Sequence, residues 1–315
     1  MSAWLKVYHP EVFYASILAS QPMGFYSPQS LVADARRHGV RILPADVTVS
    51  AVHPCVEYDD AHPPLPATAT RLVNPRADRA VRLGLAGIRT IGTQCAKEIV
   101  EERQREPFSS LADLAARVNL TRAQLEALAA ADALRAWGTR RQNLWAAGAL
   151  AGEYGQVRRQ WVQPPLPGTA IGVNAPELPQ MDNVEEAVAD VWATGVSPSS
   201  YPTSFVRDRL DGVLTSAQAR HAESGSRVKV AGVVTHRQRP HTAKGVTFLS
   251  LEDETGLINV VCSAGLWRRY RSLARTSAAL IIRGIVESRD GVMNVVADGM
   301  EELSLAVPSR SRDFR

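Results

Sequence analysis

Cysteine is scarce in this sequence and shows no pairing pattern. The 315 residues include three cysteines, Cys55, Cys95 and Cys262, which lie far apart with no C-x-x-C pair. Disulfide frameworks and zinc knuckles need closely and regularly spaced cysteines, so neither is indicated. His53 lies near Cys55 but has no further metal ligands beside it. We expect a reducing, cytoplasmic environment and no metal on this chain.

Long apolar runs are missing as well. No segment approaches the roughly 20 apolar residues of a membrane span. The first residues also lack the charged-then-apolar order of a signal peptide. We therefore expect a soluble protein that is not exported and has no membrane partner.

Motifs that carry catalysis on their own are absent too. The sequence contains no glycine-rich phosphate loop and no nucleophile elbow. Its densest acidic groups are Asp59-Asp60 and Glu252-Asp253-Glu254, which lie in polar stretches typical of solvated turns. No catalytic residue is therefore predicted on this chain.

What is present is the composition of a globular protein. With 45% hydrophobic and 22% charged residues, the chain is long enough for two or three small domains. The 36 Lys and Arg against 32 Asp and Glu give a formal net charge of +4. Such a charge permits nucleic-acid binding without requiring it, so local clustering must decide.

The first 75 residues predict helices followed by an irregular region. Apolar residues at helical spacing over 4–18 predict an amphipathic helix that starts without an N-cap signal. A second helix has Ser27 as its N-cap, Pro28 at its first position and Gly39 as its end. A short strand over 40–47 is interrupted by Pro44, and residues 48–75 lack periodicity.

Residues 82–103 have the order of a helix-hairpin-helix element. The run is Leu83-Gly84-Leu85-Ala86-Gly87-Ile88-Arg89-Thr90-Ile91-Gly92, and a helix over 94–103 follows. A hairpin glycine lets backbone N–H groups approach a phosphate, and the helix N-terminus adds its dipole. A plain helix connector is the alternative, because Thr90 stands where the first hairpin glycine is usual. If DNA binds here, the expected contacts are Arg89, Thr90, Gly92 and Thr93.

Two more helices favour a paired module of this kind. One is expected over 110–118, and the other is opened by the capping box Thr121-x-x-Gln124. The proline-rich residues 151–183 then predict a linker.

The last third of the sequence predicts a small β-barrel. Strands are expected over 227–238, 245–252 and 257–262, then a helix over 264–274, then strands over 278–288 and 291–297. This order matches the five-stranded barrel of an OB-fold. Residues 226–300 contain 11 Lys and Arg against 6 Asp and Glu, so basic charge is concentrated here.

Candidate DNA contacts in the barrel lie on its first two strands and the loop between them. Basic side chains can neutralise phosphates and an exposed ring can stack on a base. The candidates are Arg237, Arg239, His241, Lys244 and Phe248. The alternative is a solvated loop with the phenylalanine inside the barrel, and the sequence leaves this open.

Several stretches resemble bacterial C-family DNA polymerases of the DNA polymerase III α-subunit type. They are SAWLKVYHPEVFYASILASQPMGFYSPQSLVADARRHGVRILPADV, RLGLAGIRTIG, FSSLADLAARVNLTRAQLEALAAADAL and QRPHTAKGVTFLSLEDETGLINVV. The segment Ser20-Gln21-Pro22-Met23-Gly24-Phe25-Tyr26-Ser27 resembles the error-prone, damage-inducible branch more than the main replicase. The resemblance extends over nearly the whole chain and implies the C-terminal portion of such an enzyme.

This resemblance implies an α+β, multidomain architecture. Its parts would be a fingers-like helical end at 1–75, a tandem helix-hairpin-helix module at 76–150 and the linker at 151–183. A helical connector at 184–225, a five-stranded OB-fold β-barrel at 226–305 and a basic tail at 306–315 would follow.

The function implied is the DNA-binding and partner-binding portion of a translesion DNA polymerase, used in replication of damaged DNA, repair and damage-induced mutagenesis. The palm aspartates that hold Mg²⁺ in this family are not in the sequence, so this chain alone is expected to be inactive as a nucleotidyltransferase. The alternative is a free-standing protein derived from a split polymerase gene, which binds single strands or acts as a scaffold.

The partners implied are single-stranded and primer-template DNA, the rest of the polymerase and a mutasome accessory protein of Y-family-polymerase type. Replicative relatives carry a sliding-clamp peptide, a Gln followed by large apolar or aromatic residues. The corresponding linker here offers Gln180-Met181-Asp182-Asn183-Val184, with little anchor area. Direct clamp binding is therefore expected to be weak or absent.

Overall fold

The computed structural model describes residues 2–24, 26–59, 78–160, 175–243, 245–289, 292–309 and 312–314. Parts of the expected irregular region at 48–75 and linker at 151–183 lie outside these residues. The described chain forms two compact units. Of the described residues, those in 2–21, 40–59, 78–160 and 175–198 belong to one unit, and those in 22–24, 26–39 and from 199 onward belong to the other.

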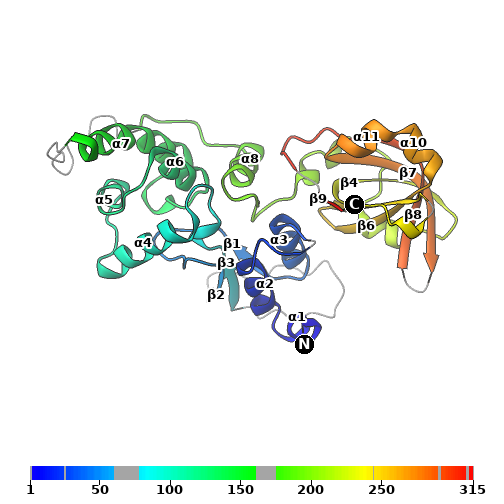
Figure 1. Ribbon diagram of the computed structural model, residues 1–315, viewed down its shortest axis with the longest axis horizontal. Helices are drawn as coiled ribbons and strands as arrows, with labels where there is room; N and C mark the ends of the chain where they lie inside the picture. The colour runs from blue at the N-terminus through cyan, green and yellow to red at the C-terminus, as the bar shows by residue number, and fades with distance from the viewer. Residues whose placement is uncertain are drawn as a thin grey trace. The chain divides into compact units, whose positions relative to one another are not determined.

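The first unit begins with two short helices, α1 (Ser2–Tyr8) and α2 (Pro10–Ala19), which are drawn in blue in Figure 1. The sequence predicts one helix here, but Pro10 starts a new one because proline lacks an N–H donor and favours the first helical turn. Helix α2 packs on a three-stranded sheet of order β1-β3-β2. Its strands are β1 (Arg41–Leu43), which ends before Pro44, β2 (Cys55–Tyr58) and β3 (Arg79–Arg82).

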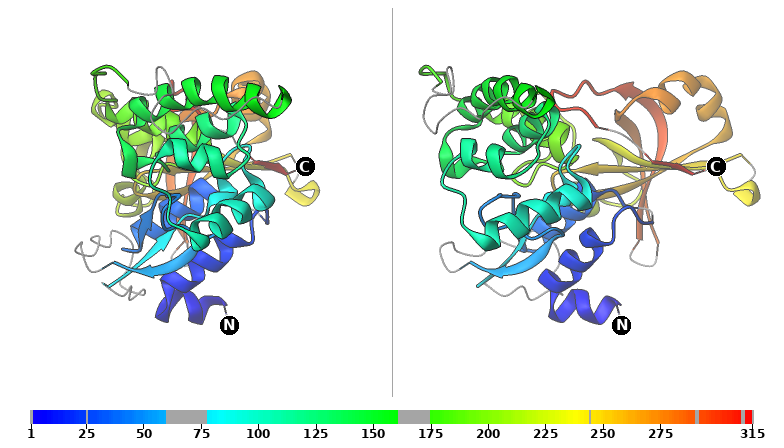
Figure 2. Two further views of the ribbon diagram at one scale, coloured as in Figure 1. Left: turned by 90° about the vertical axis from the view of Figure 1, so that its left-hand side faces the viewer. Right: turned by 60° about the vertical axis from the view of Figure 1, so that its left-hand side comes forward.

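A helical region follows the sheet. Its elements are η1 (Leu85–Gly87), α4 (Gly92–Arg105), α5 (Leu111–Arg117), α6 (Arg122–Ala130), η2 (Arg135–Trp137), α7 (Arg140–Gln160) and α8 (Asn183–Thr194). Thr121 and Gln124 form the predicted capping box at the start of α6. Helices α6 and α7 lie side by side (Figure 2) and bury Leu125, Leu128 and Leu150. Helix α7 continues through residues 151–160, where the sequence predicts the start of the linker.

The second unit is built around a closed barrel. Its strands are β4 (Arg227–Gln238), β5 (Thr247–Asp253), β6 (Gly256–Cys262), β7 (Ala279–Arg289) and β8 (Val292–Glu302). They pair in the order β5-β6-β8-β7-β4, and β4 also pairs with β5 to close the barrel. The fold class predicted from the sequence, a helix-hairpin-helix region followed by a five-stranded OB-fold, is confirmed.

Short elements surround the barrel. Helices α10 (Ala264–Arg269) and α11 (Arg271–Thr276) lie across one end of it, as Figure 1 shows. The elements η3 (Pro202–Phe205), η4 (Arg207–Arg209) and α9 (Ser216–Arg220) precede the first strand, and η5 (His241–Ala243) follows it. Strand β9 (Arg312–Phe314), in the expected basic tail, pairs in parallel with β4.

Helix α3 (Pro28–Arg37) belongs to the second unit. It begins at the predicted N-cap Ser27, whose hydroxyl accepts a hydrogen bond from the backbone N–H of Ser30. Ser30 Oγ and Arg37 Nη2 donate to the two carboxylate oxygens of Glu252 on β5, at 2.7 and 2.9 Å. From the sequence, these residues are expected with the region 1–75, whereas their contacts group them with the barrel.

Candidate nucleic-acid interface

The first candidate surface is the hairpin between η1 and α4. Its apolar side chains Leu85, Ile88 and Ile91 are buried and anchor the turn. All four residues predicted to contact DNA in this hairpin are exposed, namely Arg89, Thr90, Gly92 and Thr93. The structure therefore brings these four together on one solvent-facing turn.

Two residues of this hairpin have a left-handed backbone conformation. The φ angle is 64° at Thr90 and 62° at Gly92. Glycine adopts this conformation readily, whereas other residues do so at a cost of roughly 1–2 kcal/mol. The hairpin thus keeps a glycine-like backbone shape at Thr90 although the residue is β-branched.

The N-terminus of α4 is open to an anion. Ile91 at the N-cap position supplies no side-chain hydrogen bond, and a Cβ placed on Gly92 would meet no atom within 4 Å. The first N–H groups of a helix lack intrahelical acceptors and carry the positive end of its dipole. A phosphate oxygen can therefore approach the backbone at Gly92 and Thr93.

Neighbouring helices hold the hairpin in place. Gln124 Nε2 donates to the carbonyl oxygen of Thr90 at 3.1 Å, and the backbone N–H of Arg89 donates to the carbonyl oxygen of Ala193 at 2.7 Å. The Arg89 guanidinium lies over the Trp192 ring, 5.0 Å from its centroid. The sequence does not predict the contacts of Gln124 and Trp192 with this hairpin. Its local pattern indicates Gln124 only as a capping residue and Trp192 only as an apolar residue.

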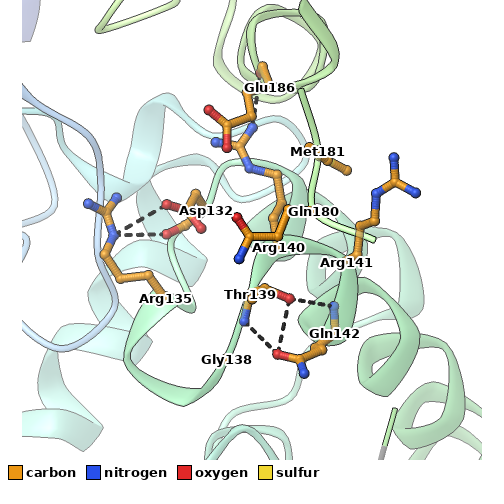
Figure 3. Close-up of a pocket in the computed structure, with 10 residues that line it drawn as sticks. All are labelled: Asp132, Arg135, Gly138, Thr139, Arg140, Arg141, Gln142, Gln180, Met181 and Glu186. Atoms are coloured by element: carbon orange, nitrogen blue, oxygen red, sulfur yellow. Dashed lines mark hydrogen bonds and ion pairs between the residues drawn. The ribbon is translucent and has the colours of Figure 1, made fainter. Parts of the chain in front are cut away.

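A hollow of about 470 Å³ lies beside the start of α7 (Figure 3), and three arginines are among its lining residues, Arg135, Arg140 and Arg141. Arg140 Nη2 donates to Asp190 Oδ1 at 2.9 Å, and Arg141 Nη2 donates to Glu185 at 2.7 Å. Burial raises the pKa of the Asp190 carboxyl, and Arg140 beside it acts in the opposite direction. Arg140 and Arg141 therefore join α7 to α8, and much of their charge is balanced within the protein.

The segment that corresponds to a clamp peptide lies at the start of α8. Asp182 caps the helix by accepting from the backbone N–H of Glu185 at 2.8 Å, and the Glu185 side chain accepts from the backbone N–H of Asp182 in return. Gln180 and Met181 line the hollow in Figure 3. The segment is thus part of a capped helix start rather than an extended strand.

In the barrel, Arg237 does not lie where the DNA-contact prediction needs it. Its side chain is buried, with Nε and Nη2 donating to the carbonyl oxygens of Ala274 and Ser277 at 2.7 and 2.5 Å. These carbonyls lie at the end of α11, where helical acceptors lack intrahelical donors. The guanidinium therefore stabilises a helix end and does not face a DNA phosphate.

Arg239 and Phe248 are exposed, as a DNA contact requires. Phe248 is 38% exposed, whereas its neighbours on β5, Leu249 and Leu251, are buried in the barrel core. The alternation along the strand thus turns the Phe248 ring outward. His241 lies in η5, where the structure describes its backbone but not its side chain. Lys244 lies outside the described residues.

Buried ionisable groups at the edge of the barrel are structural. Burial raises the pKa of Glu252, while Arg37 and the hydrogen bonds of Ser30 and Tyr201 act in the opposite direction. The Tyr201 hydroxyl beside it is fully buried, and burial together with Glu252 raises its pKa well above the usual value.

Over the described part of the chain, no group of three or more His, Cys, Asp and Glu residues could hold a metal ion. No described helix is long and apolar enough to cross a membrane.

The hairpin and the barrel together define a class of protein, a nucleic-acid-binding chain with a helix-hairpin-helix region and an OB-fold. Family models agree with this class. Residues 39–144 match the helix-hairpin-helix motif, and residues 228–303 match the OB-fold nucleic acid binding domain.

The whole chain is homologous to the C-terminal part of proteins named error-prone DNA polymerase. It is 50% identical over 326 residues to the one from Nocardia farcinica and 52% identical over 319 residues to the one from Mycobacterium tuberculosis. These matches cover 100% of this chain but only 26% and 27% of the relatives. The chain therefore spans about a quarter of the length of the curated relatives it matches.

Two similar solved structures each match less than a third of this chain. The asparaginyl-tRNA synthetase from Pyrococcus horikoshii matches 30% of this chain and 23% of its own, with 19% identity and a TM-score of 0.26. The E. coli protein ygiW matches 29% of this chain and 89% of its own, with 16% identity and a TM-score of 0.23. These values support no functional comparison.

Proposed function

We propose that this chain holds DNA for an error-prone polymerase. In this proposal the hairpin of the first unit binds the backbone of the primer-template duplex, and the barrel binds the single-stranded template. The proposal is carried by the exposed left-handed hairpin at an uncapped helix start, in a chain that also contains a basic OB-fold. Nucleotide transfer with Mg²⁺, translesion synthesis and cytoplasmic DNA repair would be activities of the complete polymerase.

The hairpin is tested by adding a side chain at Gly92. Gly92→Val places a β-branched residue in a left-handed turn, on the side where a phosphate would approach. Duplex binding by fluorescence anisotropy should weaken roughly tenfold, as loss of one charge-assisted hydrogen bond predicts. Gly87→Val is the matched control, because Gly87 is exposed in the same hairpin but has no left-handed φ. A folded Gly92→Val protein that binds duplex normally would identify the hairpin as a plain connector.

The barrel is tested through the salt dependence of single-strand binding. If Arg239 contacts a phosphate, Arg239→Ala should lower the slope of log affinity against log salt by about 0.7. Arg105→Ala is the control, because Arg105 is a 73%-exposed arginine on α4, outside the barrel. Arg237→Ala should instead destabilise the barrel, since its guanidinium is bonded to two carbonyl oxygens. An unchanged salt slope for Arg239→Ala would mean that the loop between β4 and β5 is solvated and makes no phosphate contact through Arg239.

We also propose that recruitment depends on an accessory protein rather than on direct clamp binding. The structural support is the capping box Asp182–Glu185, which ties the clamp-like segment into α8. Calorimetry of the chain against purified sliding clamp and against a Y-family-type accessory protein tests this. Micromolar or tighter clamp binding that is lost in Gln180→Ala would contradict the proposal.

A further inference from the structure

The outer face of the barrel carries a second aromatic ring besides Phe248. Tyr26 lies just before α3, is 50% exposed, and packs edge-on against His236 of β4. The two ring centroids are 5.9 Å apart and the planes meet at 84°. Tyr26 lies outside residues 228–303, so the OB-fold match does not include it.

The strand register puts His236, against which Tyr26 packs, on the same face of the sheet as Phe248. His236 pairs with Ser250, and Gln238 pairs with Phe248. Paired residues on neighbouring strands share a face, as do residues two apart on one strand. His236 and Phe248 are therefore diagonal neighbours on the outward face of adjacent strands, roughly 7–8 Å apart.

Helix α3 fixes the position of Tyr26. The next residue, Ser27, is the N-cap of this helix, and Ser30 and Arg37 near its two ends both bind the buried carboxylate of Glu252. Glu252 lies two residues beyond Ser250 on β5, with its side chain fully buried. The hydrogen bonds from α3 to Glu252 of β5 thus hold the segment that carries Tyr26 against the barrel.

The surroundings of the two rings suit a single-stranded nucleic acid. Arg239 is exposed and follows directly after Gln238, the strand partner of Phe248. Asn259, the partner of Ser250 on β6, is exposed and supplies hydrogen-bonding groups on the same face. Rings provide surfaces for bases, and a guanidinium provides charge for phosphates.

We infer that Tyr26 and Phe248 form a two-ring platform on which bases of single-stranded DNA stack. This inference rests on the proposed function of the barrel. It adds to that function a base-contacting residue contributed by the N-terminal segment, which neither the OB-fold match nor the candidate residues from the sequence include.

The test uses the full chain and a labelled oligodeoxythymidylate. Tyr26→Leu keeps an apolar side chain against His236 but removes the aromatic face, and Tyr26→Phe keeps the face but removes the hydroxyl. Tyr26→Leu and Phe248→Leu should each weaken binding by roughly 5- to 100-fold, as expected for a stacked base, without changing the salt slope. Tyr26→Phe should bind like the unaltered chain. Tyr58→Leu is the matched control, because Tyr58 is a 71%-exposed tyrosine on β2 in the other unit.

A second readout separates stacking from a structural role of Tyr26. An oligodeoxythymidylate carrying 5-iododeoxyuridine should photocrosslink to a peptide that contains Tyr26, and the crosslink should be lost in Tyr26→Leu. If the unaltered chain does not bind the oligonucleotide, the proposed function of the barrel fails. If it binds but neither the Tyr26→Leu affinity nor the crosslink supports contact, only the platform fails, and a protein partner becomes the better occupant of this face.

Discussion

At the scale of single residues, Thr90 has an unusual conformation for its type. A β-branched residue at φ 64° is strained, yet both the side chain and the backbone carbonyl of Thr90 form hydrogen bonds. Its hydroxyl donates to the carbonyl oxygen of Arg89 at 2.5 Å, and its own carbonyl accepts from Gln124. These contacts hold the hairpin in the shape that a glycine would adopt without strain.

This strain predicts the order of stability of two Thr90 variants. Thr90→Gly and Thr90→Ala both remove the hydroxyl, but only glycine relieves the left-handed strain. Thr90→Gly should therefore be more stable than Thr90→Ala by about 1 kcal/mol, which is the strain less the entropy cost of glycine. Urea denaturation of the first unit measures the difference. Equal stabilities would mean that the hairpin relaxes to another backbone conformation.

Some individual residues can be assigned from the sequence and others cannot. The caps at Ser27 and Thr121 are predictable because each bonds to a group three residues away. Arg237 is not, since its acceptors lie 37 and 40 residues later and meet it only when α11 packs on the barrel. The outward direction of Phe248 likewise depends on which side of β5 faces the core.

At the scale of elements, the turn between β5 and β6 is tied to the short helices that precede the barrel. Glu254 accepts from Arg207 Nε at 2.6 Å and from the Thr203 hydroxyl at 2.5 Å. Burial raises the pKa of Glu254, but the hydrogen bonds from Arg207, Thr203 and the backbone together outweigh burial and lower the pKa below its usual 4.5.

The lowered pKa of Glu254 predicts acid destabilisation of the barrel. A carboxylate whose pKa is depressed by folding stabilises the folded state above its unfolded pKa, and this stability is lost as pH falls through the folded pKa. Glu254→Gln should therefore cost about 1 kcal/mol or less at neutral pH, since the group is partly exposed, and cost nothing in strong acid. Urea denaturation of both proteins from about pH 7 to about pH 3 tests this. A parallel offset at every pH would show that the charge of Glu254 does not matter.

Helix α3 provides a stronger test of how elements depend on each other. Arg37→Ala leaves the fully buried Glu252 without its guanidinium, which should destabilise the second unit by about 3–5 kcal/mol. Replacing both partners, as in Arg37→Leu with Glu252→Leu, removes the unpaired charge and should recover most of that loss. Tryptophan fluorescence in urea can follow the transition. A cost below about 1 kcal/mol for Arg37→Ala would mean that the pair behaves like a surface ion pair.

At the scale of the whole molecule, local sequence patterns predict the two kinds of domain. They do not predict which helices belong to which unit. Periodicity and turn residues suffice for the hairpin and the barrel strands, because these signals lie within a few residues. The assignment of α3 to the barrel depends on a bond between residues 215 positions apart, which no local pattern contains. In the same way α8, expected in a connector, is bonded to α7 through Arg140 and Asp190.

The whole chain should bind primer-template DNA without extending it. The resemblance to C-family polymerases implies that the aspartates that hold Mg²⁺ lie in a palm domain, and this chain spans only about a quarter of the length of its relatives. We expect duplex binding in anisotropy, but no template-dependent incorporation with Mg²⁺ or Mn²⁺ in a primer-extension assay. A complete error-prone polymerase is the positive control, and the same enzyme with Gly92→Val at the matching position should extend primers less processively. Incorporation by the purified chain, abolished by replacing a carboxylate such as Asp59, would overturn this prediction and place catalysis within these 315 residues.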